Sequence, residues 1–118
     1  MNGRILVIDD DRELCEETKE FLELEGYAVD IAFDGHSGKK LLGTGVYDIV
    51  LLDCKLPDAD GMLVLNDIQH IAPGTRIFLV TGKPFVEKLL QQNNTLKLAV
   101  KVMQKPLDPE ELLKALKT

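Results

Sequence analysis

The chain has 118 residues, of which 45% are hydrophobic and 29% charged, and its formal net charge at pH 7 is −6. This length and composition predict one globular domain, 1–118, with a core of its own. The negative charge argues against a nucleic-acid backbone or an anionic membrane as a direct partner. No apolar run approaches the length of a membrane span, and MNGRILVIDDD lacks the pattern of a signal peptide. We therefore expect a cytoplasmic protein in which Cys15, as part of the core, and Cys54 are reduced thiols.

Five short segments are rich in β-branched residues and are predicted to be strands. In chain order they are RILVID (4–9), AVDIAF (28–33), DIVLLD (48–53), RIFLVT (76–81) and AVKVMQ (99–104). The first, third and fourth are almost continuous apolar runs, which are typical of strands buried on both faces of a parallel sheet.

Apolar residues at helical spacing occupy the segments between and after these strands. In chain order, the residues that mark the helices are Leu14, Phe21, Leu22 and Leu24; Leu41 and Leu42; Met62, Leu65 and Ile68; Phe85, Leu89 and Leu90; and Leu112, Leu113 and Leu116. The first helix is expected over 12–24 with Asp11 as its N-cap, and Pro84 can open the fourth. QQNNTLK at 91–97 predicts the loop before the last strand.

Five strand–helix pairs predict an α/β fold with a doubly wound parallel sheet and right-handed crossovers. The periodicity is compatible with several folds of this kind and does not choose the strand order. In open sheets of this class, ligands bind outside the carboxyl ends of the strands. The residues at those ends are therefore the candidates for a functional site.

Charged and hydroxyl side chains follow the predicted strands. In chain order they are Asp9 and Asp10 at the end of the first strand, Asp53 at the end of the third, Thr81 at the end of the fourth and Lys105 after the fifth. Three clustered carboxylates repel one another and need a countercharge, which a hard, oxygen-seeking cation such as Mg²⁺ supplies. No His or Cys of suitable spacing accompanies them, which argues against Zn²⁺.

Such a cluster favours chemistry at phosphorus. A carboxylate beside a metal can attack phosphorus and form an aspartyl phosphate, and Asp53 is the candidate nucleophile. The phosphoryl oxygens then need electrophiles, which the Lys105 ammonium and the Thr81 hydroxyl would supply. An isolated acidic run would more simply be a helix cap, but the apolar strand before it and the downstream residues favour a site.

With these residues in place, the chain resembles the CheY-like receiver domain of response regulators, the phosphoacceptor module of bacterial two-component signalling. The matching stretches are ILVIDDD, DIVLLDCKLPDADGM, FLVTG and QKPLDPEELL, which cover essentially the whole chain in the family's order. The resemblance implies a flavodoxin-like (βα)5 topology with strand order 2-1-3-4-5. It also implies a protein that is not a conventional enzyme, because receivers catalyse only their own phosphorylation and dephosphorylation.

The resemblance assigns a role to each matching residue. Asp53 matches the phosphoacceptor, Asp10 the direct metal ligand and Asp9 the second acid of the pair. The backbone carbonyl of Lys55 falls where the family supplies a further oxygen, so the implied Mg²⁺ ligands are Asp9, Asp10, Asp53 and Lys55. Thr81 matches the hydroxyl that moves toward the phosphoryl group.

The region around the lysine both matches the family and departs from it. Lys105 matches the family's lysine, and Pro106 fits the cis peptide bond that follows it. The family usually carries Tyr or Phe three residues before the lysine, where this chain has Val102. An aliphatic side chain cannot make the ring's inward and outward swing. The loop after Thr81 and the helix that follows it are then the expected two-state element.

The implied partner is a sensor histidine kinase or a histidine phosphotransfer protein, which donates a phosphoryl group from phosphohistidine to Asp53. Phosphorylation is expected to shift the surface of helix four, strand five and helix five, and the family allows phosphorylation-dependent homodimers. If the chain is complete, it would signal by docking to an effector; a longer chain would continue from LKALKT into an output domain.

Three alternatives share part of this pattern. Haloacid-dehalogenase phosphotransferases need an acid two residues after the nucleophile, where this chain has Lys55. Flavodoxin-like electron carriers need a Ser/Thr/Gly-rich phosphate loop, and DDDREL has the wrong charge for a flavin phosphate. A degenerate receiver that acts as a phosphorylation-independent interaction module stays open, because Val102 departs from the family pattern.

Overall fold

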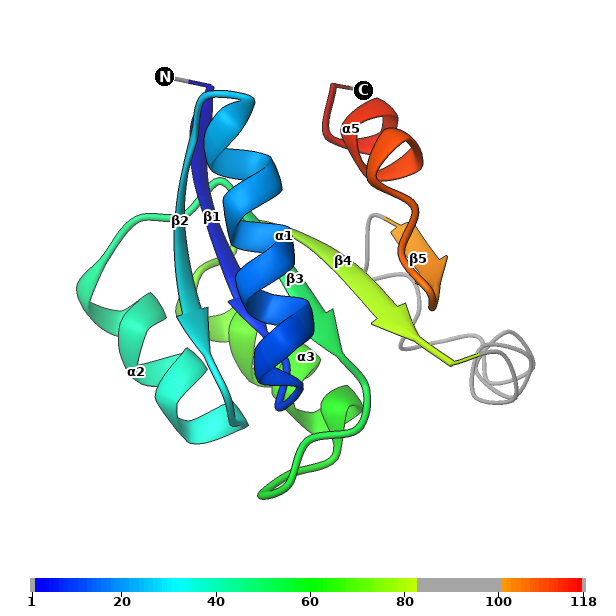
Figure 1. The fold of residues 1–118 in the computed structure, drawn as a ribbon. Helices are drawn as coiled ribbons and strands as arrows, with labels where there is room; N and C mark the ends of the chain where they lie inside the picture. The colour runs from blue at the N-terminus through cyan, green and yellow to red at the C-terminus, as the bar shows by residue number, and fades with distance from the viewer. Residues whose placement is uncertain (1, 83–100, 118) are drawn as a thin grey trace.

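The computed structural model describes residues 2–82 and 101–117 and contains a five-stranded parallel sheet with the order β2-β1-β3-β4-β5. The strands are β1 (Gly3–Ile8), β2 (Tyr27–Ala32), β3 (Ile49–Asp53), β4 (Arg76–Thr81) and β5 (Lys101–Gln104). Because every pairing is parallel, all carboxyl ends lie at the same edge of the sheet (Figure 1). The predicted fold class and strand order are confirmed.

Helices cover both faces of the sheet. They are α1 (Arg12–Leu24), α2 (Gly35–Thr44), α3 (Gly61–Ile71) and α5 (Pro109–Lys117). Figure 1 shows α1 on one face and α2 and α3 on the other, and the buried side of α5 packs with that of α1. None of the described helices is long and apolar enough to cross a membrane. The helix expected from Pro84, the loop expected at 91–97 and the start of the strand expected over 99–104 lie outside the described residues.

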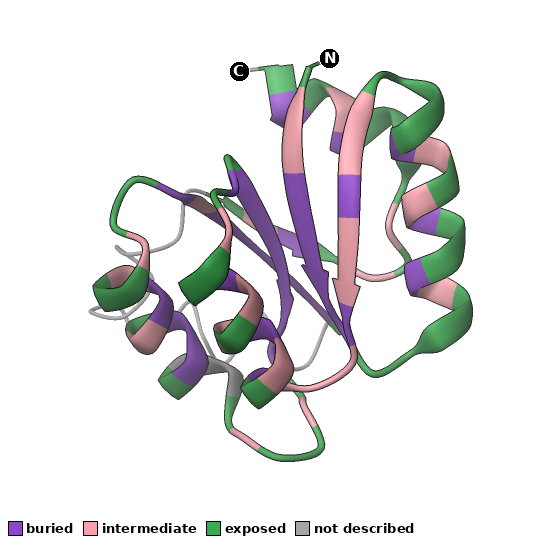
Figure 2. Cartoon of the chain, turned by 90° about the vertical axis from the view of Figure 1, so that its left-hand side faces the viewer, coloured by how far each residue is buried: buried purple, intermediate pink, exposed green. Residues whose placement is uncertain are grey.

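Each face of the sheet contributes a separate hydrophobic core, because side chains alternate along a strand. On the side of α2 and α3, the buried residues include Leu6, Ile8, Val50, Leu52, Leu79, Val64, Leu65 and Ile68. On the side of α1 and α5, they include Ile5, Val7, Leu51, Phe78, Cys15, Leu22 and Leu112. Burial on both faces explains the continuous apolar runs of β1, β3 and β4, which Figure 2 shows as largely buried.

Helix α1 has the predicted bounds but a narrower buried stripe than the sequence suggested. The carboxylate of Asp11 accepts a hydrogen bond from the backbone N–H of Leu14, as expected of an N-cap. The buried positions are Cys15, Thr18 and Leu22. Leu24, which we counted among the apolar markers, is 81% exposed. It stands about 200° around the helix from Leu22 and therefore faces solvent.

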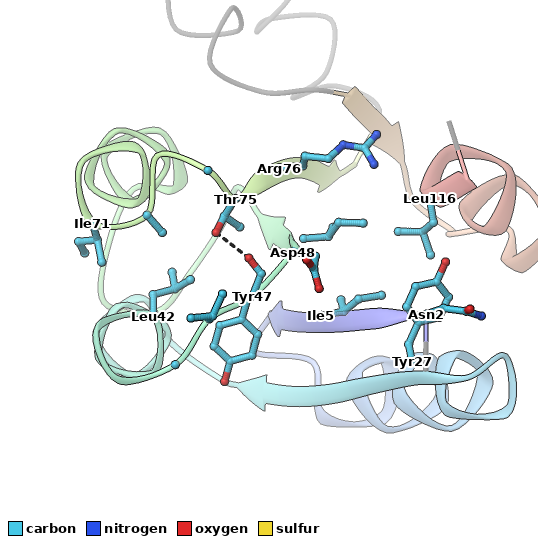
Figure 3. Close-up of a pocket in the computed structure, with 15 residues that line it drawn as sticks. Asn2, Ile5, Tyr27, Leu42, Tyr47, Asp48, Ile71, Thr75, Arg76 and Leu116 are labelled. Atoms are coloured by element: carbon cyan, nitrogen blue, oxygen red, sulfur yellow. Dashed lines mark hydrogen bonds between the residues drawn. The ribbon is translucent and has the colours of Figure 1, made fainter.

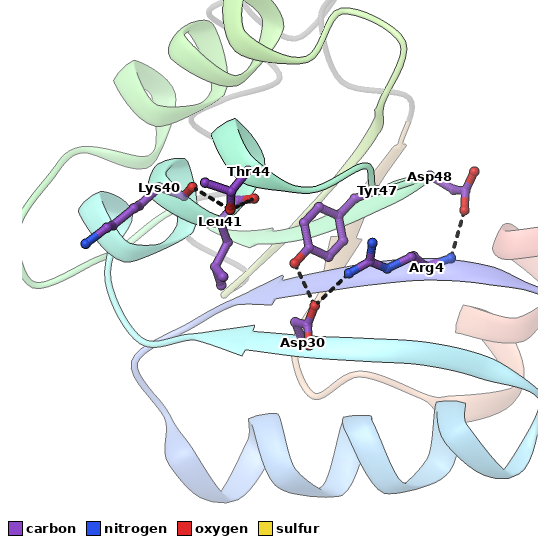
Figure 4. A network of polar contacts seen from close by, with 7 residues as sticks. All are labelled: Arg4, Asp30, Lys40, Leu41, Thr44, Tyr47 and Asp48. Carbon is purple, nitrogen blue, oxygen red and sulfur yellow. Dashed lines mark hydrogen bonds and ion pairs between the residues drawn. The ribbon is translucent and has the colours of Figure 1, made fainter.

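A polar network joins the first three strands in the sheet order (Figure 4). The Tyr47 hydroxyl donates to Oδ2 of Asp30 at 2.6 Å, and the Arg4 guanidinium lies 3.3 Å from the same oxygen. The backbone N–H of Arg4 donates to Asp48 at 2.7 Å. Burial, together with the hydrogen bond to Asp30, raises the pKa of Tyr47 to about 12. This network holds the amino ends of β1 and β3 together, away from the edge where the strands end.

Candidate functional site

Three carboxylates meet at the carboxyl edge of the sheet. Asp9 and Asp10 directly follow β1, and Asp53 is the last residue of β3. Because β1 and β3 are neighbours, one carboxylate oxygen of each residue lies within 4.8 Å of the others. Asp9 and Asp53 are only 3% and 6% exposed, whereas Asp10 is open to solvent. The fold thus brings together the three acids that the sequence singled out.

Lys105 places a positive charge between two of these acids. Its Nζ lies 2.9 Å from Oδ2 of Asp9 and 3.4 Å from Oδ2 of Asp53. The backbone N–H of Lys105 donates to the carbonyl of Thr81 at 2.8 Å, which ties the chain after β5 to the end of β4. The peptide bond between Lys105 and Pro106 is cis, as the resemblance implied.

Backbone N–H groups orient the two buried carboxylates. The N–H of Asp11 donates to Oδ1 of Asp9 at 3.0 Å, and the N–H of Lys55 donates to Oδ1 of Asp53 at 3.3 Å. In both acids, Oδ1 therefore faces the following turn and Oδ2 faces Lys105. The carboxylates are held in place before any ligand arrives.

Burial and charge shift the proton affinities of this cluster. Burial raises the pKa of Asp53 above its ordinary 3.8, and the charge of Asp9 adds to the rise, against the opposing effect of Lys105. Burial alone would lower the pKa of Lys105, but the hydrogen bond to Asp9 and the charge of Asp53 outweigh it, so that pKa is raised. Asp10 adds a third negative charge. A further cation would therefore be stabilised here.

Thr81 lies at the same edge of the sheet as the acids, and its side chain is on the face opposite to that of Asp53. It ends β4, is 1% exposed, and follows Val80, the register partner of Asp53. Burial raises the pKa of the Cys54 thiol to about 11, and the Thr81 side chain beside it acts in the opposite direction. Because neighbouring side chains alternate along a strand, Thr81 and Cys54 share one face of the sheet and Asp53 faces the other.

Cys15 takes a part in the site that sequence reasoning missed. It was expected to be a core residue, and it is fully buried. Its thiol also donates to the backbone carbonyl of Asp9 at 3.2 Å. Burial, and next the charge of Asp9, raise the pKa of this thiol to about 12, so it remains a protonated donor. No sequence signal marks the contact, because it depends on how α1 crosses the end of β1.

The acidic site is separate from the cavity shown in Figure 3. That cavity measures about 600 Å³ and lies at the amino ends of the strands, among residues such as Ile5, Tyr47 and Thr75. The cavity that borders Asp9 and Asp53 measures only about 10 Å³. Among the described residues, the 600 Å³ cavity therefore lies away from the acidic cluster.

The donor atoms of the site suit a hard divalent cation. Asp9, Asp10 and Asp53 offer carboxylate oxygens within 4.8 Å of one another. Mg²⁺ prefers oxygen ligands and commonly takes only a few carboxylates together with water and phosphate oxygens. The hydrogen bond from the Lys55 N–H to Asp53 also brings the Lys55 peptide to the border of the site.

Comparison with known proteins assigns this arrangement to a family. The model of the response regulator receiver domain matches residues 5–117. The transcriptional regulatory protein DltR of Streptococcus agalactiae is 37% identical over 111 residues, which cover 93% of this chain and 48% of that protein. The transcriptional regulatory protein ZraR of Salmonella typhimurium is 33% identical over 113 residues, which cover 95% of this chain and 25% of that protein. This chain thus spans about half or less of the length of these relatives.

Solved structures agree with that assignment. The CheY-like receiver domain protein of Methanospirillum hungatei has a TM-score of 0.88 at 34% identity, covering 97% of this chain and 90% of that one. The response regulator TrrA of Thermotoga maritima, solved in complex with Mg²⁺-BeF, has a TM-score of 0.84 at 31% identity, covering 97% and 96%. The chain belongs to the response regulator receiver domain family of two-component systems.

Proposed function

We propose that Asp53 is the phosphoacceptor of this receiver domain and takes its phosphoryl group from the phosphohistidine of a sensor kinase or a histidine phosphotransfer protein. One observation carries the proposal: carboxylate oxygens of Asp9, Asp10 and Asp53 lie within 4.8 Å of one another. Lys105 adds an ammonium 3.4 Å from the proposed nucleophile. Phosphoryl transfer needs mainly such positioning and charge stabilisation.

The transfer exchanges one bond to phosphorus for another. A carboxylate oxygen of Asp53 attacks the phosphorus atom and forms a P–O bond, while the P–N bond to the donor imidazole breaks. The imidazole nitrogen keeps the electron pair of the broken bond and takes up a proton from solvent. In dephosphorylation, a water oxygen forms a bond to phosphorus while the P–O bond to Asp53 breaks. The products are orthophosphate, the free Asp53 carboxylate and a proton that passes to solvent. The domain thus acts on its own phosphoryl group only.

Receiver domains bind Mg²⁺ at an acidic cluster, and the oxygen donors here fit that ion. We assign Asp9, Asp10 and Asp53 as the carboxylate ligands, and the backbone carbonyl of Lys55 as a further ligand. When bound, Mg²⁺ would neutralise the carboxylates and the incoming phosphoryl oxygens. The residues themselves hold the carboxylates in fixed orientations through the N–H groups of Asp11 and Lys55.

Lys105 and Thr81 are assigned to the phosphoryl oxygens. Transfer moves negative charge from the Asp53 carboxylate to the phosphoryl group, so the Lys105 ammonium is expected to follow it. Thr81, whose side chain lies beside the Cys54 thiol, would donate its hydroxyl to that group after moving toward it. Val102 packs against the core on the α2 and α3 side in place of the family's aromatic ring. A movement of the Thr81 side chain on phosphorylation must therefore alter the surface without the rotamer change of an aromatic ring.

The remaining assignments concern the setting of the domain. We propose that 1–118 form one receiver that acts in the cytoplasm and itself contacts neither nucleic acid nor membrane. DltR and ZraR are transcriptional regulators, and output through an attached or separate effector is proposed by analogy. The surface around β5 and α5 is the proposed route to that effector or to a phosphorylation-dependent homodimer.

Intact-mass measurement after incubation with acetyl phosphate tests the proposal. Wild type should gain one phosphoryl group in Mg²⁺ and none in EDTA, and Asp53→Asn should gain none. Lys105→Met should bind Mg²⁺ but form the adduct far more slowly. Absence of an adduct in wild type, together with failure to bind beryllofluoride, would favour the phosphorylation-independent interaction module.

A further inference from the structure

The carboxylate of Asp58 links the loop after β3 to the beginning of α2. Its Oδ1 accepts a hydrogen bond from the backbone N–H of Gly35 at 2.8 Å, and its Oδ2 accepts one from the N–H of His36 at 3.0 Å. These are the first two residues of α2, whose N–H groups have no acceptor within the helix. A carboxylate is favoured at this end of a helix, and both contacts lower the pKa of Asp58.

Helix α2 already has a cap of the ordinary kind. Asp34, directly before the helix, accepts a hydrogen bond from the N–H of Ser37 at 2.7 Å. Asp58 accepts hydrogen bonds from the N–H groups of Gly35 and His36, which Asp34 does not bind. It lies 23 and 22 residues after these two positions in the sequence. Because α2 is already capped, the contacts of Asp58 serve mainly to connect the loop after β3 to the start of α2.

The loop that carries Asp58 is closed at its base beside the acidic site. Lys55 and Asp60 form an isolated antiparallel β-bridge, so Asp58 lies within the turn that these residues close. The N–H of Lys55 donates to Oδ1 of Asp53 at 3.3 Å. Lys55 thus belongs both to the closed turn and to the surroundings of Asp53. Holding the turn at Asp58 therefore restricts how the Lys55 backbone, including its carbonyl, can move.

The contact requires close packing at the start of α2. A Cβ atom at Gly35 would lie 3.0 Å from Cγ2 of Val64, 3.3 Å from Oδ1 of Asp58 and 3.5 Å from Cβ of Ala59. The absence of a side chain at Gly35 therefore lets the loop and α3 approach the helix backbone.

From this geometry we infer that Asp58 is a positioning residue for the metal site: it anchors the loop after β3 to α2 and so holds the Lys55 carbonyl where Mg²⁺ can use it. The inference rests on the proposed function, because it uses the assignment of Lys55 as a metal ligand. It adds a residue that lies in the loop after β3 and touches neither the metal nor the phosphoryl group.

Thermodynamic reciprocity gives the inference a second consequence. If the contacts of Asp58 favour Mg²⁺ binding, then Mg²⁺ must favour those contacts by the same factor. The amides of Gly35 and His36, which donate to Asp58, should therefore exchange with solvent more slowly when Mg²⁺ is bound. The amide of Ala72, which donates to Ile68 at the end of α3, should be unaffected and serves as the internal control.

The experiment combines Mg²⁺ titration by calorimetry with amide exchange by NMR. Asp58→Ala removes both acceptors, and Asp58→Asn keeps one. Asp67→Ala is the matched control, because it breaks the ion pair between Asp67 and Lys39 at 3.0 Å, which also joins α2 to its neighbour, without touching the loop. Urea unfolding of each variant measures its stability separately from metal binding.

We expect Asp58→Ala to weaken Mg²⁺ binding by about tenfold, Asp58→Asn by less, and Asp67→Ala by under twofold. In wild type, Mg²⁺ should slow exchange at Gly35 and His36 by a similar factor. Unchanged Mg²⁺ affinity in both Asp58 variants, or unchanged exchange at the two amides of wild type, would overturn the inference while leaving the proposed function intact. Lack of Mg²⁺ binding by wild type would overturn both.

Discussion

Replacing Asp53 by Asn should stabilise the metal-free domain, although it removes the proposed phosphoacceptor. At an effective dielectric of about 20, two unit charges 4.8 Å apart repel by about 3.5 kcal/mol. Asp53 has two such neighbours, Asp9 and Asp10. Its attraction to Lys105 at 3.4 Å is worth about 5 kcal/mol on the same scale. Repulsion therefore exceeds attraction by about 2 kcal/mol, before the cost of burying the charge is added.

We expect Asp53→Asn to raise the free energy of unfolding by about 1–2 kcal/mol in EDTA, which corresponds to a melting temperature higher by about 4–8 °C. The pKa of Asp53 is raised above its ordinary 3.8, so its ionised form costs stability as the pH rises. The advantage of asparagine should accordingly vanish in acid and grow as the pH rises through the folded-state pKa of Asp53.

Urea unfolding followed by far-UV circular dichroism measures the effect, with Glu20→Gln on the exposed side of α1 as the control for a lost surface charge. The control should shift stability by less than about 0.5 kcal/mol. Saturating Mg²⁺ should make wild type the more stable of the two. An ion at a hundred times its Kd stabilises the folded protein by about 2.7 kcal/mol, and the variant lacks one of the carboxylates proposed to bind it. An Asn variant less stable than wild type in EDTA would refute the electrostatic account.

Tyr47, the two buried thiols and Thr81 each allow a further test. Tyr47→Phe removes the hydrogen bond to Asp30 and should cost about 1 kcal/mol in urea unfolding at pH 7. In wild type, ultraviolet absorbance should show Tyr47 ionising near its pKa of about 12, and stability should fall as the pH rises from 10 toward that value. The thiols of Cys15 and Cys54, with pKa values of about 12 and 11, should resist a disulfide reagent at pH 8 and react only when the protein unfolds; rapid labelling of the native protein would contradict their burial. Thr81→Ala should still take up a phosphoryl group from acetyl phosphate, about tenfold more slowly, and an unchanged rate by intact mass would remove Thr81 from the site.

The place of the acidic site could be predicted because it depends on strand ends alone. A buried run that ends on Asp53, and another that is followed by Asp9 and Asp10, can be recognised in one dimension. Parallel pairing then brings those ends to one edge. The strand order could not be derived in this way, since every doubly wound arrangement has the same periodicity. It came from the family resemblance and was confirmed by the sheet pairings.

Contacts that depend on where a buried side chain points could not be predicted from the sequence. The movement of the Thr81 hydroxyl toward the phosphoryl group stays a prediction, and its position beside the Cys54 thiol has no signal in the sequence. Cys15 looked like core alone, yet its thiol reaches the Asp9 carbonyl. The hydropathy pattern predicts that such residues are buried, but it does not predict which polar atoms they contact.

Contacts between a loop and a distant part of the chain could not be predicted from the sequence either. Asp58 lies in LPDADG, a stretch that any reading of turn residues assigns to the loop itself. The carboxylate oxygens of Asp58 accept hydrogen bonds from the backbone N–H groups of Gly35 and His36, more than 20 residues earlier in the sequence. The error at Leu24 has a simpler cause: an apolar residue near a helix end was counted toward a stripe that it does not share.

The central claim is that Asp53 itself carries the phosphoryl group. The most direct test is borohydride reduction of the protein after treatment with acetyl phosphate and Mg²⁺, followed by peptide mass spectrometry, because reduction converts an aspartyl phosphate to homoserine at the modified position. The account predicts homoserine at position 53 and intact aspartate at Asp9 and Asp10. Homoserine at Asp9 or Asp10, or at none of the three in a sample that shows the phosphoryl adduct, would contradict it.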